Sequence, residues 1–222
     1  MKVCTDACLF GAWVAEQVKS QKLKVKNVLD IGAGTGLLSL MLAQKTNAAI
    51  DAVEIDEAAA IQAQQNFETS PWKERLKVYC TSVQQFNSSA NQLYDLIISN
   101  PPFFENDLKS NDTKRNLALH SAELSLEELL QAITKHLRED GLFAVLLPYH
   151  RTEYFENLAK EKYFLLEKVL IKQTPKHDYF RSVLLFSKLP GEYSEKEIII
   201  MNEDGRYTNE FTELLKDYYL YL

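Results

Sequence analysis

The segment that most constrains the fold of this chain is a short apolar run followed by three glycines at alternate positions. Residues 25–31 have the length and the β-branched content of a buried strand rather than of a helix. They lead directly into Gly-Ala-Gly-Thr-Gly at 32–36, and the apolar residues 37–43 then have the composition of a helix. Glycine lets the backbone turn tightly and approach a ligand that a Cβ would block. The segment therefore predicts the strand, turn and helix that open a nucleotide-binding α/β domain.

The residues around these glycines also bear on the kind of ligand. Leu37 stands where the dinucleotide-binding pattern Gly-x-Gly-x-x-Gly requires its third glycine. Asp30 lies at the strand end just ahead of the glycines. A carboxylate there would repel a pyrophosphate, but it suits a cationic amino group such as that of the methionine part of S-adenosylmethionine. The arrangement resembles the first motif of the Rossmann-like methyltransferases. For this motif taken alone, a glycine-rich turn without a ligand is the alternative.

Apolar segments and turn residues predict alternating strands and helices over the rest of the chain. This alternation indicates an α/β fold with a doubly wound, mostly parallel sheet, and 222 residues without an internal linker suit a single domain, 1–222. Residues 1–20 are expected to form a helix over the cofactor site, and residues 190–222 a C-terminal extension. Seven strands are expected, one of them antiparallel near the C-terminus, at 25–31, 48–55, 76–80, 94–99, 142–147, 165–171 and 182–186, with an extra edge strand at 197–201.

Helices are expected between these strands and after them. Ser125 and Glu128 form a capping-box pattern ahead of the helix 126–137, and Gly141 is expected to close that helix. The other expected helices span 37–43, 57–67, 151–161 and 211–219.

A second acidic residue ends the second expected strand. Glu54 lies twenty residues beyond Gly34, about where Rossmann-type folds place the acid that hydrogen-bonds a ribose. Capping of the helix that begins at Glu57 is the alternative role for this carboxylate. Beside the glycine motif, the ribose contact is the better supported interpretation.

The fourth expected strand ends in Asn100-Pro101-Pro102-Phe103. An amine conjugated to an aromatic ring is a poor nucleophile because its lone pair is delocalised. The side-chain oxygen of Asn100 and the carbonyl of Pro101 can accept its two hydrogens, while Pro102 stiffens the loop. Phe103 offers a face on which a planar substrate can stack. We therefore interpret these four residues as catalytic in methyl transfer to an amine, without a metal; a rigid turn without a chemical role is the alternative.

Several segments together resemble the bacterial tRNA1(Val) adenine N6-methyltransferase family. The resemblance covers nearly the whole chain, and its most family-specific parts are the opening segment and the aromatic tail. It is carried by Met-Lys-Val-x-Thr-Asp at 1–6, Gly-Ala-Trp at 11–13, and the segments 29–38, 52–54, 70–72, 95–103, 181–186 and 218–221. The resemblance implies a Rossmann-like fold, S-adenosylmethionine as cofactor, and methylation at N6 of the adenine next to the anticodon of tRNA1(Val).

The resemblance also implies which residues bind the cofactor. Many relatives carry an acid after the third strand that contacts the cofactor's adenine; here Thr81 and Ser82 stand instead, and a hydroxyl can accept the same amine hydrogen. The implied cofactor-binding residues are Thr5, Asp30, Gly32, Ala33, Gly34, Gly36, Glu54, Ile55, Ser82 and Asn100.

Basic residues in two expected loops predict where RNA binds. The net charge of −6 argues against a nucleic-acid partner for the surface as a whole, but a local basic patch can bind phosphates on an acidic protein. The loops 104–120 and 172–181 should border the crevice. The predicted partner is the anticodon loop of a tRNA, with one base flipped onto Phe103. The predicted RNA contacts are Lys114, Arg115, His120, Lys176 and Arg181.

Composition and the remaining motifs limit the other classes of function. The chain has three cysteines, no Cys-x-x-Cys pair, no signal-peptide pattern and no apolar run of membrane-spanning length, which favours a cytoplasmic protein that binds neither membrane nor metal. The Asn-Pro-Pro-aromatic motif also serves methyltransferases of rRNA guanine N2, DNA adenine N6 and protein glutamine. These activities, and a non-catalytic RNA-binding module, are the alternatives.

Overall fold

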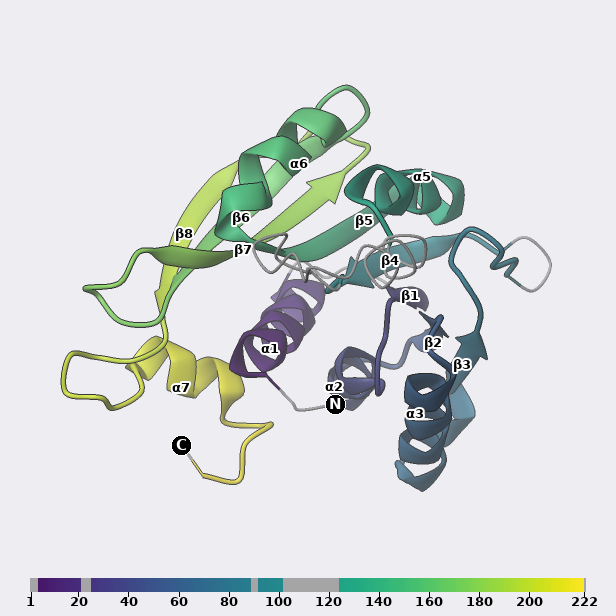
Figure 1. Cartoon of the computed structure of the whole chain (residues 1–222), viewed down its shortest axis with the longest axis horizontal. Helices are drawn as coiled ribbons and strands as arrows, with labels where there is room; N and C mark the ends of the chain where they lie inside the picture. Colours follow the sequence, from purple (N-terminus) through teal and green to yellow (C-terminus); the bar gives the residue numbers. More distant parts are fainter. Residues whose placement is uncertain (1–3, 21–24, 89–91, 102–123, 222) are drawn as a thin grey trace, which may run out of the picture.

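The computed structural model describes residues 4–20, 25–88, 92–101 and 124–221. Within these ranges the chain forms one eight-stranded sheet in the order β3-β2-β1-β4-β5-β7-β6-β8 (Figure 1). The strands are β1 Asn27–Ile31, β2 Ala49–Glu54, β3 Leu76–Cys80, β4 Tyr94–Ser99, β5 Leu137–Pro148, β6 Phe164–Lys172, β7 Tyr179–Ser187 and β8 Ser194–Ile199.

Strand β7 is antiparallel to both of its neighbours, β5 and β6, and every other pairing is parallel. The predicted doubly wound, mostly parallel sheet is confirmed. Its eighth strand is the expected extra edge strand, which occupies 194–199 rather than 197–201.

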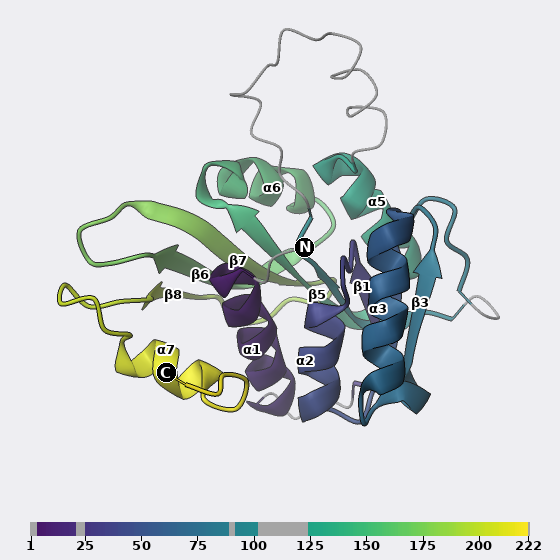
Figure 2. The same ribbon diagram turned by 60° about the horizontal axis from the view of Figure 1, so that its bottom comes forward.

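Helices cover both faces of the sheet (Figure 2). One face packs against α1 Thr5–Ser20, α2 Leu37–Lys45, α3 Glu57–Thr69 and α7 Asn209–Leu215, and the other against α5 Leu126–His136 and α6 Thr152–Ala159. Alternate residues of each central strand enter the two resulting cores; Val28 belongs to the first and Leu29 to the second. Among the described residues, no helix has the length and apolar character needed to cross a membrane.

The end of α5 differs from the expectation. The capping box of Ser125 and Glu128 is present, but the helix ends at His136 and the chain continues directly into β5. Gly141 therefore lies within a strand and closes no helix. A Cβ at this position would come within 3.1 Å of the carbonyl oxygen of Tyr94, where the pairing of β4 with β5 shifts register.

Candidate functional site

Three adjacent strand ends bring the predicted site together. Ile31 at the end of β1 pairs with Val53 of β2 on one side and with Ser99 of β4 on the other. The residues that follow at this edge are therefore neighbours, because adjacent strands lie about 4.8 Å apart. The glycine turn, Glu54 and Asn100 thus lie together at the carboxyl ends of parallel strands, the edge at which α/β sheets bind their ligands in a crevice.

The three glycines have left-handed backbone conformations but different surroundings. Gly32, Gly34 and Gly36 have φ values of 72°, 57° and 82°. A Cβ placed on Gly32 would meet none of the described residues within 4 Å, whereas one on Gly36 would lie 2.4 Å from the ring of Phe67. Gly32 therefore borders open space, while Gly36 allows α2 and α3 to pack closely. The amides of Gly32 and Ala33 both donate to the carbonyl of Val53, which anchors the turn on β2.

Asp30 is completely buried beneath this turn. Its Oδ2 accepts a hydrogen bond from Ser39 Oγ at 2.7 Å, but its Oδ1 has no hydrogen-bond partner among the described residues. Desolvation raises the pKa of Asp30 to about 7, against the opposing effect of the Ser39 hydrogen bonds. A carboxylate with unused acceptor capacity beside an open position favours a cationic group there. Ser39 is a residue of this candidate site that sequence reasoning missed, although a lone serine in the apolar run 37–43 was a usable signal.

Glu54 supports the turn from the neighbouring strand. Its Oε2 accepts from Gly34 N at 2.7 Å, and its Oε1 accepts from Asp56 N at 2.8 Å. Asp56, not Glu54, caps α3 by accepting from Ala59 N. The alternative role of Glu54 as a helix cap is therefore wrong. Each carboxylate oxygen still has a free lone pair for a hydroxyl donor.

Two further predicted cofactor contacts lie beside Glu54. Ile55 is 55% exposed, which leaves an apolar side chain open at the edge of the crevice. The amide of Thr81 donates to the carbonyl of Glu54, so the turn after β3 lies next to that residue. In this turn the Ser82 hydroxyl accepts from Gln85 N at 3.3 Å and keeps a second lone pair.

The first turn of α1 lies at the same edge of the sheet. Asp6 Oδ2 accepts from Arg181 Nε at 2.8 Å, and Arg181 pairs with Pro148 at the carboxyl end of β5. Thr5 hydrogen-bonds to the hydroxyl of Tyr219, so its predicted cofactor contact competes with a bond inside the protein. That contact, and the covering of a cofactor by α1, stay predictions.

Asn100 is the first residue beyond β4. The hydroxyl of Ser99 donates to the carbonyl of Ile31 at 2.8 Å, which ties this strand end to β1. Asn100 is partly exposed and Pro101 is buried. Pro102 and Phe103 lie outside the described residues, so only the two proposed hydrogen acceptors of the motif have a described position.

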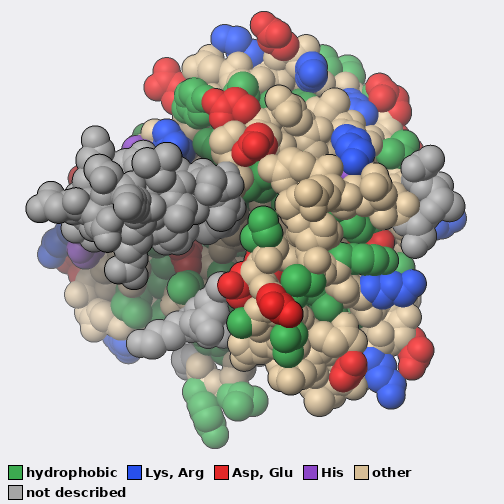
Figure 3. All heavy atoms as spheres, turned by 45° about the vertical axis from the view of Figure 1, so that its right-hand side comes forward, with side chains coloured by type: hydrophobic (Ala, Val, Ile, Leu, Met, Phe, Trp, Pro, Cys, Tyr) green, Lys and Arg blue, Asp and Glu red, His purple; other side chains and the backbone are tan. Residues whose placement is uncertain are grey.

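The predicted RNA contacts fall into two groups. Lys114, Arg115 and His120 lie outside the described residues. Lys176 is exposed and lies 3.1 Å from Glu203, and Arg181 is paired with Asp6. Phosphates would compete with these carboxylates, so the RNA contacts stay predictions. Among the described residues on the face that Figure 3 shows, cationic and acidic side chains are interspersed.

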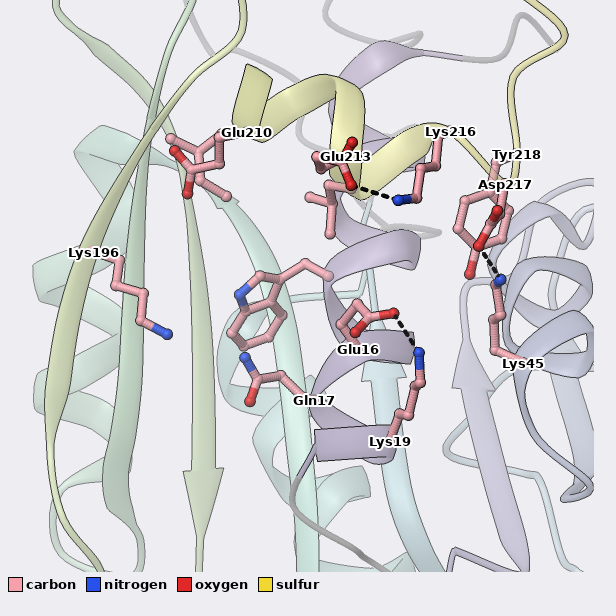
Figure 4. Close-up of a pocket in the computed structure, with 13 residues that line it drawn as sticks. Glu16, Gln17, Lys19, Lys45, Lys196, Glu210, Glu213, Lys216, Asp217 and Tyr218 are labelled. Atoms are coloured by element: carbon pink, nitrogen blue, oxygen red, sulfur yellow. Dashed lines mark hydrogen bonds and ion pairs between the residues drawn. The ribbon is translucent and has the colours of Figure 1, made fainter. Parts of the chain in front are cut away.

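A separate hollow lies between α1, α7 and β8, away from the crevice (Figure 4). Its lysines have acidic partners: Lys45 contacts Asp217, Lys216 contacts Glu213 and Lys19 contacts Glu16. None of the residues predicted from the sequence to act on a ligand lines it. The strand-end crevice is therefore the candidate site.

Comparison with known proteins agrees with the fold and the motifs. Residues 12–162 match the family model of the methyltransferase small domain. A tRNA1(Val) (adenine(37)-N6)-methyltransferase from Photorhabdus laumondii is 41% identical over 224 residues, covering 100% of this chain and 89% of that protein.

Two solved structures share the fold at low sequence identity. A predicted O-methyltransferase from Agrobacterium tumefaciens has a TM-score of 0.72 at 16% identity and covers 95% of both chains. An S-adenosylmethionine-dependent methyltransferase from Clostridium acetobutylicum has a TM-score of 0.58 at 16% identity, with 82% of this chain and 92% of that chain covered. These likenesses concern the architecture alone.

Proposed function

This chain belongs to the tRNA1(Val) (adenine(37)-N6)-methyltransferase family, and we propose that it transfers a methyl group from S-adenosylmethionine to N6 of the adenine next to the anticodon of a tRNA. The observation that carries the proposal is the meeting of the glycine turn, Glu54 and Asn100 at three adjacent strand ends. The chain has this arrangement together with full-length similarity to relatives of that name.

The residues of the crevice fit S-adenosylmethionine. The partnerless oxygen of Asp30 suits the ammonium group, and the open space at Gly32 leaves room for the methionine part. Glu54 has acceptor capacity for the ribose hydroxyls, and Ile55 offers an apolar face to the adenine. We assign the remaining contacts to Thr5, Ala33, Gly34, Gly36, Ser82 and Asn100.

The bound cofactor supplies an electrophilic methyl group on its sulfonium, so the protein has to orient the acceptor amine. Asn100 Oδ1 and the Pro101 carbonyl each accept one N6 hydrogen in this proposal. These two bonds favour a tetrahedral nitrogen, whose lone pair is then no longer delocalised into the ring. Phe103 stacks on the adenine, and the backbone phosphates contact Lys114, Arg115, His120, Lys176 and Arg181.

Mass spectrometry of modified nucleosides tests the proposal. Purified protein and S-adenosylmethionine are incubated with unmodified tRNA1(Val), rRNA, DNA and a protein fraction. We expect N6-methyladenosine in the tRNA alone, at the position next to the anticodon. Guanine N2 methylation of rRNA, adenine methylation of DNA or glutamine methylation of protein would each contradict the proposed substrate. Cofactor binding without transfer to any fraction would favour a non-catalytic RNA-binding module.

Binding of the cofactor should weaken as the pH falls below 7. Burial raises the pKa of Asp30 to about 7, so Asp30 is mostly protonated at pH 6 in the cofactor-free protein. An ammonium group favours the ionised carboxylate, and binding at pH 6 must therefore expel a proton. We expect the Kd for S-adenosylmethionine to rise about fivefold between pH 7 and pH 6. Calorimetry in buffers of different ionisation enthalpy measures both the Kd and the released proton.

Asp30→Asn is the control for this pH dependence. It should bind the cofactor more weakly at pH 7 and show no further loss at pH 6, because no carboxyl remains to titrate. If the Kd of Asp30→Asn rises between pH 7 and pH 6 as much as that of the unmodified protein, the pH dependence comes from a group other than Asp30.

A further inference from the structure

An exposed tyrosine lies at the carboxyl edge of the sheet, beyond the residues assigned so far. Tyr149 directly follows Pro148, the last residue of β5, and is 42% exposed. It begins a short 3-10 helix, Tyr149–Arg151. Its ring lies against that of Tyr179, the first residue of β7, with centroids 5.2 Å apart and planes inclined by 48°.

Side chains of β6 and β8 hold the Tyr179 ring in place. The hydroxyl of Tyr179 donates to Glu197 Oε2 at 2.7 Å, and Lys172 Nζ lies 4.5 Å from the centroid of the Tyr179 ring. Lys172 also pairs with Glu197 at 3.0 Å. Tyr179 is thus fixed by two neighbours, Glu197 and Lys172, and contacts the ring of Tyr149.

The backbone that carries Tyr149 is also fixed. Thr152, which follows the 3-10 helix, donates its amide to the carbonyl of Tyr149, and its hydroxyl lies 2.6 Å from that of Ser182 on β7. An isolated exposed tyrosine is ordinary on a protein surface. A tyrosine whose ring packs against a second, fixed ring and is still exposed has the properties of a stacking platform for a planar group.

The distance from the crevice indicates what that planar group is. Ser99 of β4 pairs with Val145 of β5, so Asn100 is level with Leu146. Tyr149 lies three residues further along the chain, roughly 10 Å beyond Asn100 at the rise of a strand. Stacked bases along one strand repeat every 3.4 Å or so, and this distance therefore spans about three nucleotides or fewer.

The surrounding charge suits a nucleic acid. His150 and Arg151 follow Tyr149 directly and are exposed. Glu197, the acidic residue that contacts Tyr179, is already paired with Lys172. A phosphate backbone can therefore approach this edge without meeting an unpaired carboxylate from Glu197.

We propose that Tyr149, supported by Tyr179, stacks on an unpaired base of the tRNA loop close to the target adenine. The inference rests on the proposed function and adds a second base-binding position to it. Tyr149 would select RNA whose loop can present two bases at this spacing.

The test compares variants of exposed tyrosines. Tyr149→Ala removes the ring, and Tyr149→Phe keeps it. Tyr193→Ala is the matched control, because Tyr193 is 52% exposed but precedes β8 at the opposite edge of the sheet. Tyr149→Ala should raise the KM for an anticodon stem-loop about tenfold, the size expected for one lost base–aromatic stack. Tyr149→Phe and Tyr193→Ala should keep the original KM, and all three should bind S-adenosylhomocysteine as before.

Stem-loops lacking one base identify the partner of Tyr149. One loop base at a time is removed and the KM is measured with the unmodified protein and with Tyr149→Ala. At one position near the adenine, removing the base should raise the KM of the unmodified protein about tenfold. It should leave the KM of Tyr149→Ala unchanged, since both changes remove the same stack. A merely structural role of Tyr149 would not produce this coupling.

Three outcomes would overturn the inference. The first is an unchanged KM in Tyr149→Ala, and the second is a KM that rises equally in the unmodified protein and in Tyr149→Ala whichever base is removed. Both would leave the proposed function intact. Failure of the unmodified protein to methylate any tRNA would overturn the proposed function and, with it, this inference.

Discussion

Replacement of Asn100 by alanine is expected to slow methyl transfer to tRNA far more than it weakens cofactor binding, in which Asn100 is one contact among several. The variant loses the side-chain oxygen that accepts an N6 hydrogen of adenine, and removal of one such positioned group typically lowers kcat by about 10²- to 10³-fold. The fold should tolerate the change, since Asn100 is partly exposed and follows the end of β4. Single-turnover transfer of a labelled methyl group to tRNA1(Val) measures the rate.

Two companion variants sharpen the Asn100 experiment. Asn100→Asp keeps an acceptor oxygen and should retain more activity than the alanine variant. Asn157→Ala removes an exposed asparagine of α6 and should leave the rate unchanged. If Asn100→Ala transfers methyl groups at the original rate, or loses cofactor affinity to the same extent as its rate, the assigned role is wrong.

Gly36→Ala is expected to have the largest effect on stability. A Cβ there would lie 2.4 Å from the Phe67 ring, and the φ of 82° already disfavours any side chain. The left-handed conformation costs roughly 1–2 kcal/mol and overpacking a further 1–3 kcal/mol. We therefore expect the free energy of unfolding, measured by chemical denaturation, to fall by about 3 kcal/mol.

Two other glycines separate the causes of this effect. Gly205 has a φ of 81°, and a Cβ there would meet none of the described residues within 4 Å, so Gly205→Ala measures the free-energy cost of the left-handed backbone alone. Gly32→Ala should lose as little stability as Gly205→Ala, but its methyl group would enter the cofactor crevice and weaken cofactor binding. Equal destabilisation by Gly36→Ala and Gly205→Ala would mean that Phe67 moves aside freely.

The sequence predicted the bounds of two parallel strands well because their signals are local. The expected bounds of β3 and β4, 76–80 and 94–99, match the structure. The predicted end of α5 was wrong, because the prediction took Gly141 as the glycine that usually follows the C-terminus of a helix. Gly141 instead lies in β5 beside the register shift between β4 and β5. A Cβ there would crowd the carbonyl of Tyr94, a residue distant in sequence.

The candidate site was predictable to the extent that it follows from strand ends. Asp30, Glu54 and Asn100 each lie at the end of a parallel strand, so their meeting requires only the topology. The side-chain partners were not predictable, because they depend on how distant segments pack. Ser39 reaches Asp30 from α2, and the contact of Tyr149 with Tyr179 exists only because β7 runs antiparallel to β5.

Residues just beyond α7 contact α1 and α2 and hold α1 in place. The Tyr219 hydroxyl bonds to Thr5 and Cys8 in the first turn of α1, and Asp217 pairs with Lys45 at the end of α2. Figure 2 shows α7 and α1 side by side on the same face of the sheet. Residues 217–219 therefore complete the surroundings of α1, and this edge of the crevice reaches its final form only after they have packed against that helix.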